Sequence, residues 1–378
     1  MSYFEQTKLG NSHWATWVAV TWFSIVGWVI FQTILLFPLP IIATNTNPPL
    51  IDELMAAFSA SPPTESSQAL MGLLSVIAGL IAIIFSIVVV SVKGAVKNIF
   101  GIFTLASIVI VFATSSLTSN DAANEAVMNV LTKIMGASPF AFALFLLTFP
   151  VGLIVLYLCQ TKIHKRSLLS LHTAASKFRW IRVLQGFFLT WIVLGVFAFA
   201  AEALGIIEIE YVFAGGKFWI FALISLLFIP FQSATEEIVF RGYFNQGLTH
   251  IFKSKWAAFA ITSFAFMALH LSNPEALEGA ASGTLPIVMS GYFFFGFAMC
   301  LIVWIDDGLE TAIGIHAGNN CFAAIIMNYE NSVLPTPSVF LTGTDPVKDS
   351  ISTVIVLATL VAIIWFRRKG SRPRALSA

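Results

Sequence analysis

The sequence has 378 residues, of which 58% are hydrophobic and 10% are charged, and its formal net charge is +1. A soluble domain carries about 25% charged residues because its surface faces water, so this composition, with a mean hydropathy of +0.88, excludes a soluble protein. A net charge near zero also excludes a polybasic nucleic-acid binder. The three cysteines, Cys159, Cys300 and Cys321, are an odd number and do not indicate a disulfide framework.

Apolar stretches recur along the whole chain. A helix needs about 20 apolar residues to cross a hydrocarbon layer of roughly 30 Å. Ten stretches approach this length, which predicts an all-α, polytopic membrane helix bundle with about ten transmembrane helices, within a range of eight to ten. The first is too long for a signal-peptide core and is interpreted as a retained helix. The stretches are Trp14–Pro38, Leu70–Val92, Ile99–Leu117, Phe140–Cys159, Val183–Leu204, Phe218–Phe252, Trp256–Leu271, Leu285–Ile305, Thr311–Met327 and Ile351–Phe366.

Charge in the connecting segments predicts the orientation. Basic residues gather in the segments 93–97, 162–182, 253–255 and 367–374. With ten helices these segments all lie on one side, which the positive-inside rule makes cytoplasmic together with both termini. Asp306, Asp307 and Glu310 fall on the same side and form an acidic turn that the rule does not explain.

Three polar clusters interrupt the apolar stretches in the C-terminal half. Ionisable groups inside a membrane are costly and indicate function by default. In the first cluster, Glu237 and Arg241 are four residues apart, so they share a helix face and can form an ion pair. Glu236 is rotated by about 100° from Glu237 and is predicted to stay unpaired. It is therefore free to exchange a proton as a general base.

The other two clusters contain histidines. Phe266 and His270 are four residues apart, and Phe266 is expected to shape the wall around His270. His316 and Asn320 also share a face, where an imidazole and a carboxamide can donate hydrogen bonds to a developing oxyanion. Gly314 and Gly318 flank them at the small-xxx-small spacing that allows close helix approach. Each cluster alone has a structural explanation, but we expect the three to converge.

The ordered motifs Glu-Glu-x-x-x-Arg, Phe-x-x-x-His and His-x-x-x-Asn resemble those of the CPBP family, which comprises CAAX prenyl proteases and bacteriocin-processing (Abi) enzymes. The resemblance covers roughly residues 218–329. It implies an intramembrane endopeptidase in which Glu236 and His270 activate a water and His316 and Asn320 stabilise the oxyanion. Glu237 and Arg241 brace the helix, and Phe266 supports the site.

The resemblance also implies a division of the chain. Residues 1–210 are predicted to be an N-terminal transmembrane region of unknown role, and 211–330 the CPBP-like protease core. Residues 331–378 are predicted to hold an exposed loop, a final transmembrane helix and a basic cytoplasmic tail; the stretch Thr44–Thr64 is predicted to be a loop as well. The expected location is a bacterial plasma membrane, and the expected partners are the lipid bilayer and a peptide or protein substrate, which can itself be membrane-bound, with no nucleic acid.

Two questions stay open from the residues alone. The first is the metal: we expect a glutamate-type site without a cofactor, because no His-Glu-x-x-His is present and the Asn320 amide is a poor zinc ligand, but zinc at Glu236, His270 and His316 is the alternative. The second is the activity. A transporter or proton relay is disfavoured by the absence of an inverted repeat, and a non-catalytic immunity or scaffold protein by the intact motifs.

Overall fold

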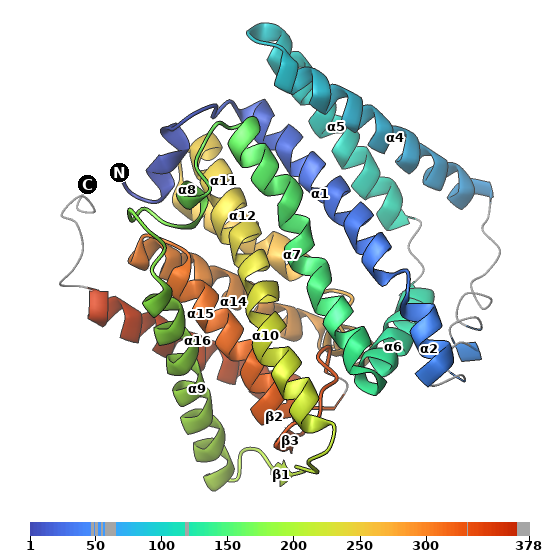
Figure 1. Cartoon of the computed structure of the whole chain (residues 1–378), viewed down its shortest axis with the longest axis vertical. Coiled ribbons are helices and arrows are strands. Elements are labelled where there is room, and N and C mark those ends of the chain that lie inside the picture. The colour runs from blue at the N-terminus through green and yellow to red at the C-terminus, as the bar shows by residue number, and fades with distance from the viewer. Residues whose placement is uncertain are drawn as a thin grey trace. The chain divides into compact units, whose positions relative to one another are not determined.

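The computed structural model describes residues 1–46, 66–117, 121–330 and 332–368, together with residues 49, 52, 53 and 56. Helices form nearly all of its regular structure (Figure 1). The chain divides into two compact units, Thr7–Leu168 and Met1–Gln6 with Leu169–Ala378. The division predicted at residues 210 and 330 stays a prediction. The basic tail beyond residue 368 and most of the loop predicted at Thr44–Thr64 lie outside the described residues.

The unit Thr7–Leu168 is built on α1, which packs against α4, α5 and α7. Small residues let these helices approach closely: a Cβ atom at Gly101 would lie 2.4 Å from the Cβ of Ala15, and one at Gly152 would lie 2.7 Å from the ring of Trp28. The role of this unit stays open. Its helices are α1 (Trp14–Leu36), α2 (Leu39–Thr46), α4 (Ser66–Ser91), α5 (Ala95–Leu117), α6 (Asp121–Ala137) and α7 (Pro139–Lys162).

The other unit holds all three polar motifs. Besides helices it contains a small sheet of three-residue strands in the order β1-β3-β2, with β1 antiparallel and β2 parallel to β3. β3 lies within the segment that was predicted to be a loop. The elements are α8 (Leu169–His172), α9 (Trp180–Ala203), β1 (Ile209–Tyr211), α10 (Phe218–Glu237), the π-helix η2 (Ile238–Phe244), α11 (Asn245–Phe252), α12 (Lys255–Ala268), α13 (Pro274–Ser282), α14 (Leu285–Asp306), α15 (Glu310–Cys321), the π-helix η3 (Phe322–Ile326), β2 (Met327–Tyr329), β3 (Phe340–Thr342) and α16 (Pro346–Arg368).

Seven helices among the described residues are long and apolar enough to span a membrane. The all-α polytopic bundle is therefore confirmed, whereas the predicted count of about ten is too high. Hydropathy counts apolar residues but does not locate helix ends: the helix over Thr311–Met327 stops at Cys321, and the apolar helices at Ala95–Val111 and Lys255–Ala268 are shorter than a full span. The seven are Trp14–Leu36, Leu70–Ser91, Pro139–Lys162, Trp180–Ala203, Phe218–Phe252, Leu285–Asp306 and Pro346–Arg368.

Helix α15, which carries His316, packs tightly against α9. A Cβ atom at Gly314 would lie 2.1 Å from the carbonyl oxygen of Val183, and one at Gly318 would lie 2.7 Å from that of Phe187. Both distances are shorter than any real Cβ contact, so the two glycines allow an approach that no side chain permits. The predicted role of this small-xxx-small pair is confirmed, and the contact fixes α15 beside the α10 helix.

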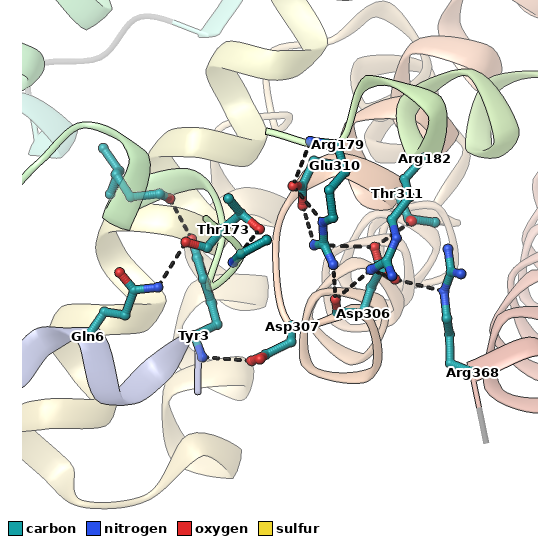
Figure 2. A network of polar contacts seen from close by, with 12 residues as sticks. Tyr3, Gln6, Thr173, Arg179, Arg182, Asp306, Asp307, Glu310, Thr311 and Arg368 are labelled. Atoms are coloured by element: carbon teal, nitrogen blue, oxygen red, sulfur yellow. Dashed lines mark hydrogen bonds and ion pairs between the residues drawn. The ribbon is translucent and has the colours of Figure 1, made fainter. Parts of the chain in front are cut away.

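The unexplained acidic turn is neutralised by three arginines from two other helices (Figure 2). Arg179 binds Glu310 with two hydrogen bonds, at 2.8 Å from Nε and 2.5 Å from Nη2. Asp306 Oδ1 lies 2.6 Å from Arg182 Nη1 and 2.8 Å from Arg368 Nε. The two acidic side chains are completely buried, so they act as buried counter-charges and do not contribute to the surface charge that the positive-inside rule counts.

The N-terminal segment is attached to the same turn. Asp307 ends α14 in the left-handed conformation, with φ of 56°, and its Oδ1 accepts a hydrogen bond from the Tyr3 backbone N–H at 2.6 Å (Figure 2). The Tyr3 hydroxyl donates to the Leu171 carbonyl at 2.6 Å. All three acidic residues of this turn therefore have partners within the protein.

Candidate active site

The two adjacent glutamates are the last residues of α10, directly before the π-helical turn η2. Such turns are rare and are frequent at functional sites. Because consecutive helical residues point about 100° apart, the two carboxylates enter different surroundings. The Glu237 side chain is completely buried, whereas 14% of the Glu236 side chain is exposed.

Glu237 has two partners. Arg241 Nη1 lies 3.1 Å from its Oε1, as the spacing of four residues suggested. The same oxygen lies 2.8 Å from His316 Nδ1, a contact that the sequence did not indicate. The Arg241 guanidinium is also buried and lies 4.2 Å from the centre of the Phe266 ring, a cation–π contact. The Phe266 ring therefore supports the ion pair of Glu237 and Arg241 in addition to its contact with His270.

His316 reaches both glutamates. Because a carboxylate can only accept, the contact with Glu237 places a proton on Nδ1 and leaves Nε2 with its lone pair in the neutral ring, an assignment made from the hydrogen-bond network. Nε2 lies 3.5 Å from Glu236 Oε2, and that oxygen is buried without a hydrogen-bond partner. Two acceptors thus face each other across a gap that a proton or a proton-bearing group can bridge.

Asn320 is connected to Glu236 through a residue that the sequence analysis missed. Its Nδ2 donates to Gln232 Oε1 at 3.2 Å, and Gln232 Nε2 donates to Glu236 Oε1 at 2.5 Å. Asn320 Oδ1 in turn accepts from Asn319 Nδ2 at 3.1 Å. Gln232 lies one turn before Glu236 on α10, and this i, i+4 spacing inside a membrane helix was the signal that could have revealed it.

His270 lies just beyond the end of α12. Its Nδ1 is 2.7 Å from the Phe266 carbonyl oxygen, so Nδ1 donates and Nε2 keeps its lone pair. The ring stacks on Tyr292 with centroids 4.3 Å apart and an interplanar angle of 28°. Burial lowers the pKa of His270, and the nearby negative charge of Glu236 acts in the opposite direction. The centroid of the Phe266 ring lies 4.5 Å from that of His270 and 6.2 Å from that of His316, so the two imidazoles share one aromatic neighbour.

A second acidic group, also missed, lies behind the ring of Tyr292. The Tyr292 hydroxyl donates to Glu275 Oε1 and accepts from Asn273 Nδ2, the latter at 2.9 Å. Glu275 and Asn273 come from the start of α13, which follows His270 in the chain. Tyr292 is the first residue of an aromatic run in α14. Such a run in an apolar helix is typical of side chains that face lipid, so the sequence did not indicate that Tyr292 contacts His270 and Glu275.

The side chains of this site also bear on whether it can hold a metal ion. Within the described part of the chain, no three His, Cys, Asp or Glu side chains are grouped so that they could hold a metal ion. The site does contain a carboxylate–imidazole pair, Glu237 and His316, in which the other imidazole nitrogen faces a second carboxylate. This arrangement orients His316 whether or not an ion takes part.

Comparison with known proteins places this site in a family. Residues 215–322 match the family model of the Rce1-like type II CAAX prenyl endopeptidases. Over 213 residues the chain is 29% identical to the uncharacterized protein YyaK of Bacillus subtilis (strain 168), an alignment that covers 54% of this chain and 69% of that protein. No solved structure matches the chain. The matched segment contains all three motifs, so residues 215–322 are similar to the Rce1-like type II CAAX prenyl endopeptidases, in agreement with the resemblance of the motifs to the CPBP family.

Proposed function

We propose that the protein is an intramembrane endopeptidase that hydrolyses a peptide bond in or beside the bilayer. The observation that carries this proposal is the buried Oε2 of Glu236, which has no hydrogen-bond partner and lies 3.5 Å from the Nε2 of His316. A carboxylate kept in a low-dielectric setting beside an imidazole lone pair is suited to proton transfer. The family match supports the same reaction class.

In this proposal Glu236 and His270 hold a water and take its proton as the water attacks the carbonyl carbon of the substrate. Both have an acceptor atom available, Oε2 in Glu236 and Nε2 in His270. The proton then passes to the amine of the leaving peptide, so the products are a carboxylate and an amine. Holding the water and the carbonyl in one buried site removes much of the entropic barrier.

The oxyanion is stabilised by His316 and Asn320. His316 donates through Nε2 when the ring is doubly protonated, and the carboxylates of Glu236 and Glu237, which flank the ring, stabilise that cation. The Asn320 amide uses one N–H for Gln232 and retains the second for the oxyanion, since an amide nitrogen carries two donors. Removal of one such donor in other hydrolases costs roughly a hundredfold to a thousandfold in kcat.

We propose a glutamate-type reaction without a metal, with a zinc ion on Glu236, His270 and His316 as the alternative. The two differ in their response to chelators. Dialysis of the purified protein against 1,10-phenanthroline should leave the rate unchanged in the first case. Loss of activity that added zinc restores would establish the second.

The proposed setting is a bacterial plasma membrane with both termini in the cytoplasm, a peptide or protein substrate that can itself be membrane-bound, and no nucleic-acid partner. The neutralised acidic turn supports this orientation, because Asp306 and Glu310 no longer oppose the positive-inside rule. Seven crossings alone would put the termini on opposite sides, so the proposal requires that an odd number of the shorter apolar helices cross as well. Cysteine accessibility at Ser2 and at Ser371, tested in sealed vesicles, measures the positions of the two ends. Opposite labelling of the two sites would contradict the proposal.

The activity itself is tested with the full chain in detergent and two quenched fluorescent peptides that end in a Cys-aliphatic-aliphatic-X sequence, one farnesylated and one not. We expect cleavage by the wild-type protein and none by Glu236→Gln. The glutamine keeps the size of the side chain and can form hydrogen bonds, but it cannot take the proton of the water. Cleavage needs no sealed compartment, which separates a peptidase from a transporter. Full activity of Glu236→Gln on a cleaved peptide would refute the assignment.

A further inference from the structure

The amide of Gln232 lies between the two halves of the site. Its side chain is 8% exposed and is therefore buried. Nε2 donates to Glu236 at 2.5 Å, while Oε1 accepts from Asn320 at 3.2 Å and from the Ser233 hydroxyl at 3.1 Å. Gln232 therefore connects Glu236 and Asn320 through one side chain.

The chemistry of these contacts fixes the direction of every amide. A carboxylate only accepts, so the NH2 group of Gln232 must face Glu236 and its carbonyl must face Asn320. Asn320 must then present its NH2 group to Gln232 and its carbonyl to Asn319, which donates at 3.1 Å. An isolated asparagine has two amide orientations of similar energy, and this chain of hydrogen bonds selects one.

The same contacts determine which oxygen of Glu236 is available. Oε1 is occupied by Gln232, whereas Oε2 faces His316 and has no hydrogen-bond partner. Gln232 therefore leaves one oxygen for the proton and also turns an N–H of Asn320 toward the site.

We propose that Gln232 is a positioning residue of this site, which holds the Glu236 carboxylate through Oε1 and orients the Asn320 amide as an oxyanion donor. The inference rests on the proposed peptidase function. It predicts an effect on kcat, with little effect on KM, because Gln232 acts through other residues. A structural amide would change only the amount of folded protein.

The first variant is Gln232→Met, which keeps the size of the side chain but removes both hydrogen bonds. We expect kcat on the cleaved fluorescent peptide to fall about tenfold to a hundredfold, as for loss of a hydrogen bond to a charged group. KM should stay near its wild-type value.

The second variant, Gln232→Glu, distinguishes positioning from packing. The side chain keeps its size and can still accept from Asn320, but it places a second carboxylate beside Glu236 Oε1, where like charges repel each other. A packing role predicts wild-type kcat per folded molecule, whereas a positioning role predicts that kcat falls at least as far as in Gln232→Met.

The matched control is Gln246→Met. Gln246 is also a buried glutamine of the span Phe218–Phe252, but its Nε2 donates to the Ser170 carbonyl at 2.9 Å. It should lower the yield of folded protein without changing kcat per folded molecule. If Gln232→Met retains the wild-type kcat while Glu236→Gln is inactive, the inference fails and the proposed function stands. Reduced folding in both Gln232 variants with unchanged kcat per folded molecule would also overturn it. Unimpaired cleavage by Glu236→Gln would overturn both proposals.

Discussion

The Nδ1 of His316 lies 2.8 Å from the Oε1 of Glu237, the same oxygen that pairs with Arg241 at 3.1 Å. Glu237 therefore joins the ion pair of one helix to the histidine of another. From the spacing of four residues between Glu237 and Arg241, only an ion pair that stabilises this helix was predicted. In the folded protein Glu237 also fixes the tautomer and the direction of His316, so the ion pair and the orientation of His316 depend on one carboxylate.

Separate and combined replacements of Glu237 and Arg241 should give unequal effects. Either single variant, Glu237→Gln or Arg241→Met, leaves one buried charge without its partner and should lower the free energy of unfolding by about 3 kcal/mol or more. The double variant should lose less than the sum, because the charges are removed together. Unfolding in a detergent–denaturant titration measures all three.

The double variant carries a second expectation. It removes the charged acceptor of His316 Nδ1, so peptide cleavage should stay low even where folding recovers. A double variant that folds and cleaves at the wild-type rate would show that Glu237 does not orient His316. Normal folding of Glu237→Gln with lost turnover would instead exchange the roles of the two glutamates.

The local part of this site could be predicted from sequence, and the rest could not. Glu237 and Arg241 lie on one helix, where a spacing of four residues determines proximity. The contact of His316 with Glu237 depends on how α15 packs beside α10, which the two glycines permit but do not specify. Gln232 carries no charge, so it did not stand out in an apolar helix, and Tyr292 was hidden in an aromatic run.

The stacking of Tyr292 on His270 should affect activity more than the tyrosine hydroxyl does. Tyr292→Phe keeps the ring, with centroids 4.3 Å apart in the wild-type protein, and loses the hydrogen bond to Glu275. Tyr292→Leu loses both. Stacked rings contribute about 1 kcal/mol beyond burial, so we expect kcat to fall several-fold further in Tyr292→Leu than in Tyr292→Phe. The reverse order would mean that the Glu275 hydrogen bond, and not the ring, positions His270.

The contact between α9 and α15 should not tolerate a methyl group. In Gly314→Ala the new Cβ would lie 2.1 Å from the Val183 carbonyl, so the helices must separate at a cost of about 1–3 kcal/mol. Because His316 and Asn320 lie on α15, cleavage should fall as well. Gly195→Ala is the control on α9: its Cβ would meet nothing within 4 Å. A midpoint of thermal unfolding for Gly314→Ala equal to that of the control would contradict the close approach.

The buried acidic turn should be a main source of stability for the unit that contains the site. Asp306→Asn removes the negative charge from a completely buried side chain that Arg182 and Arg368 contact at 2.6 and 2.8 Å. Both arginines then lose this counter-charge, and loss of one partner of a buried pair costs about 3–5 kcal/mol. Asp345→Asn is the matched control, because Asp345 is 46% exposed and its Lys348 partner lies 3.7 Å away, a surface pair of little weight. Thermal unfolding in detergent should separate the two variants clearly, with the midpoint of Asp306→Asn far below that of Asp345→Asn. Equal midpoints would show that solvent, and not Asp306, compensates the arginines.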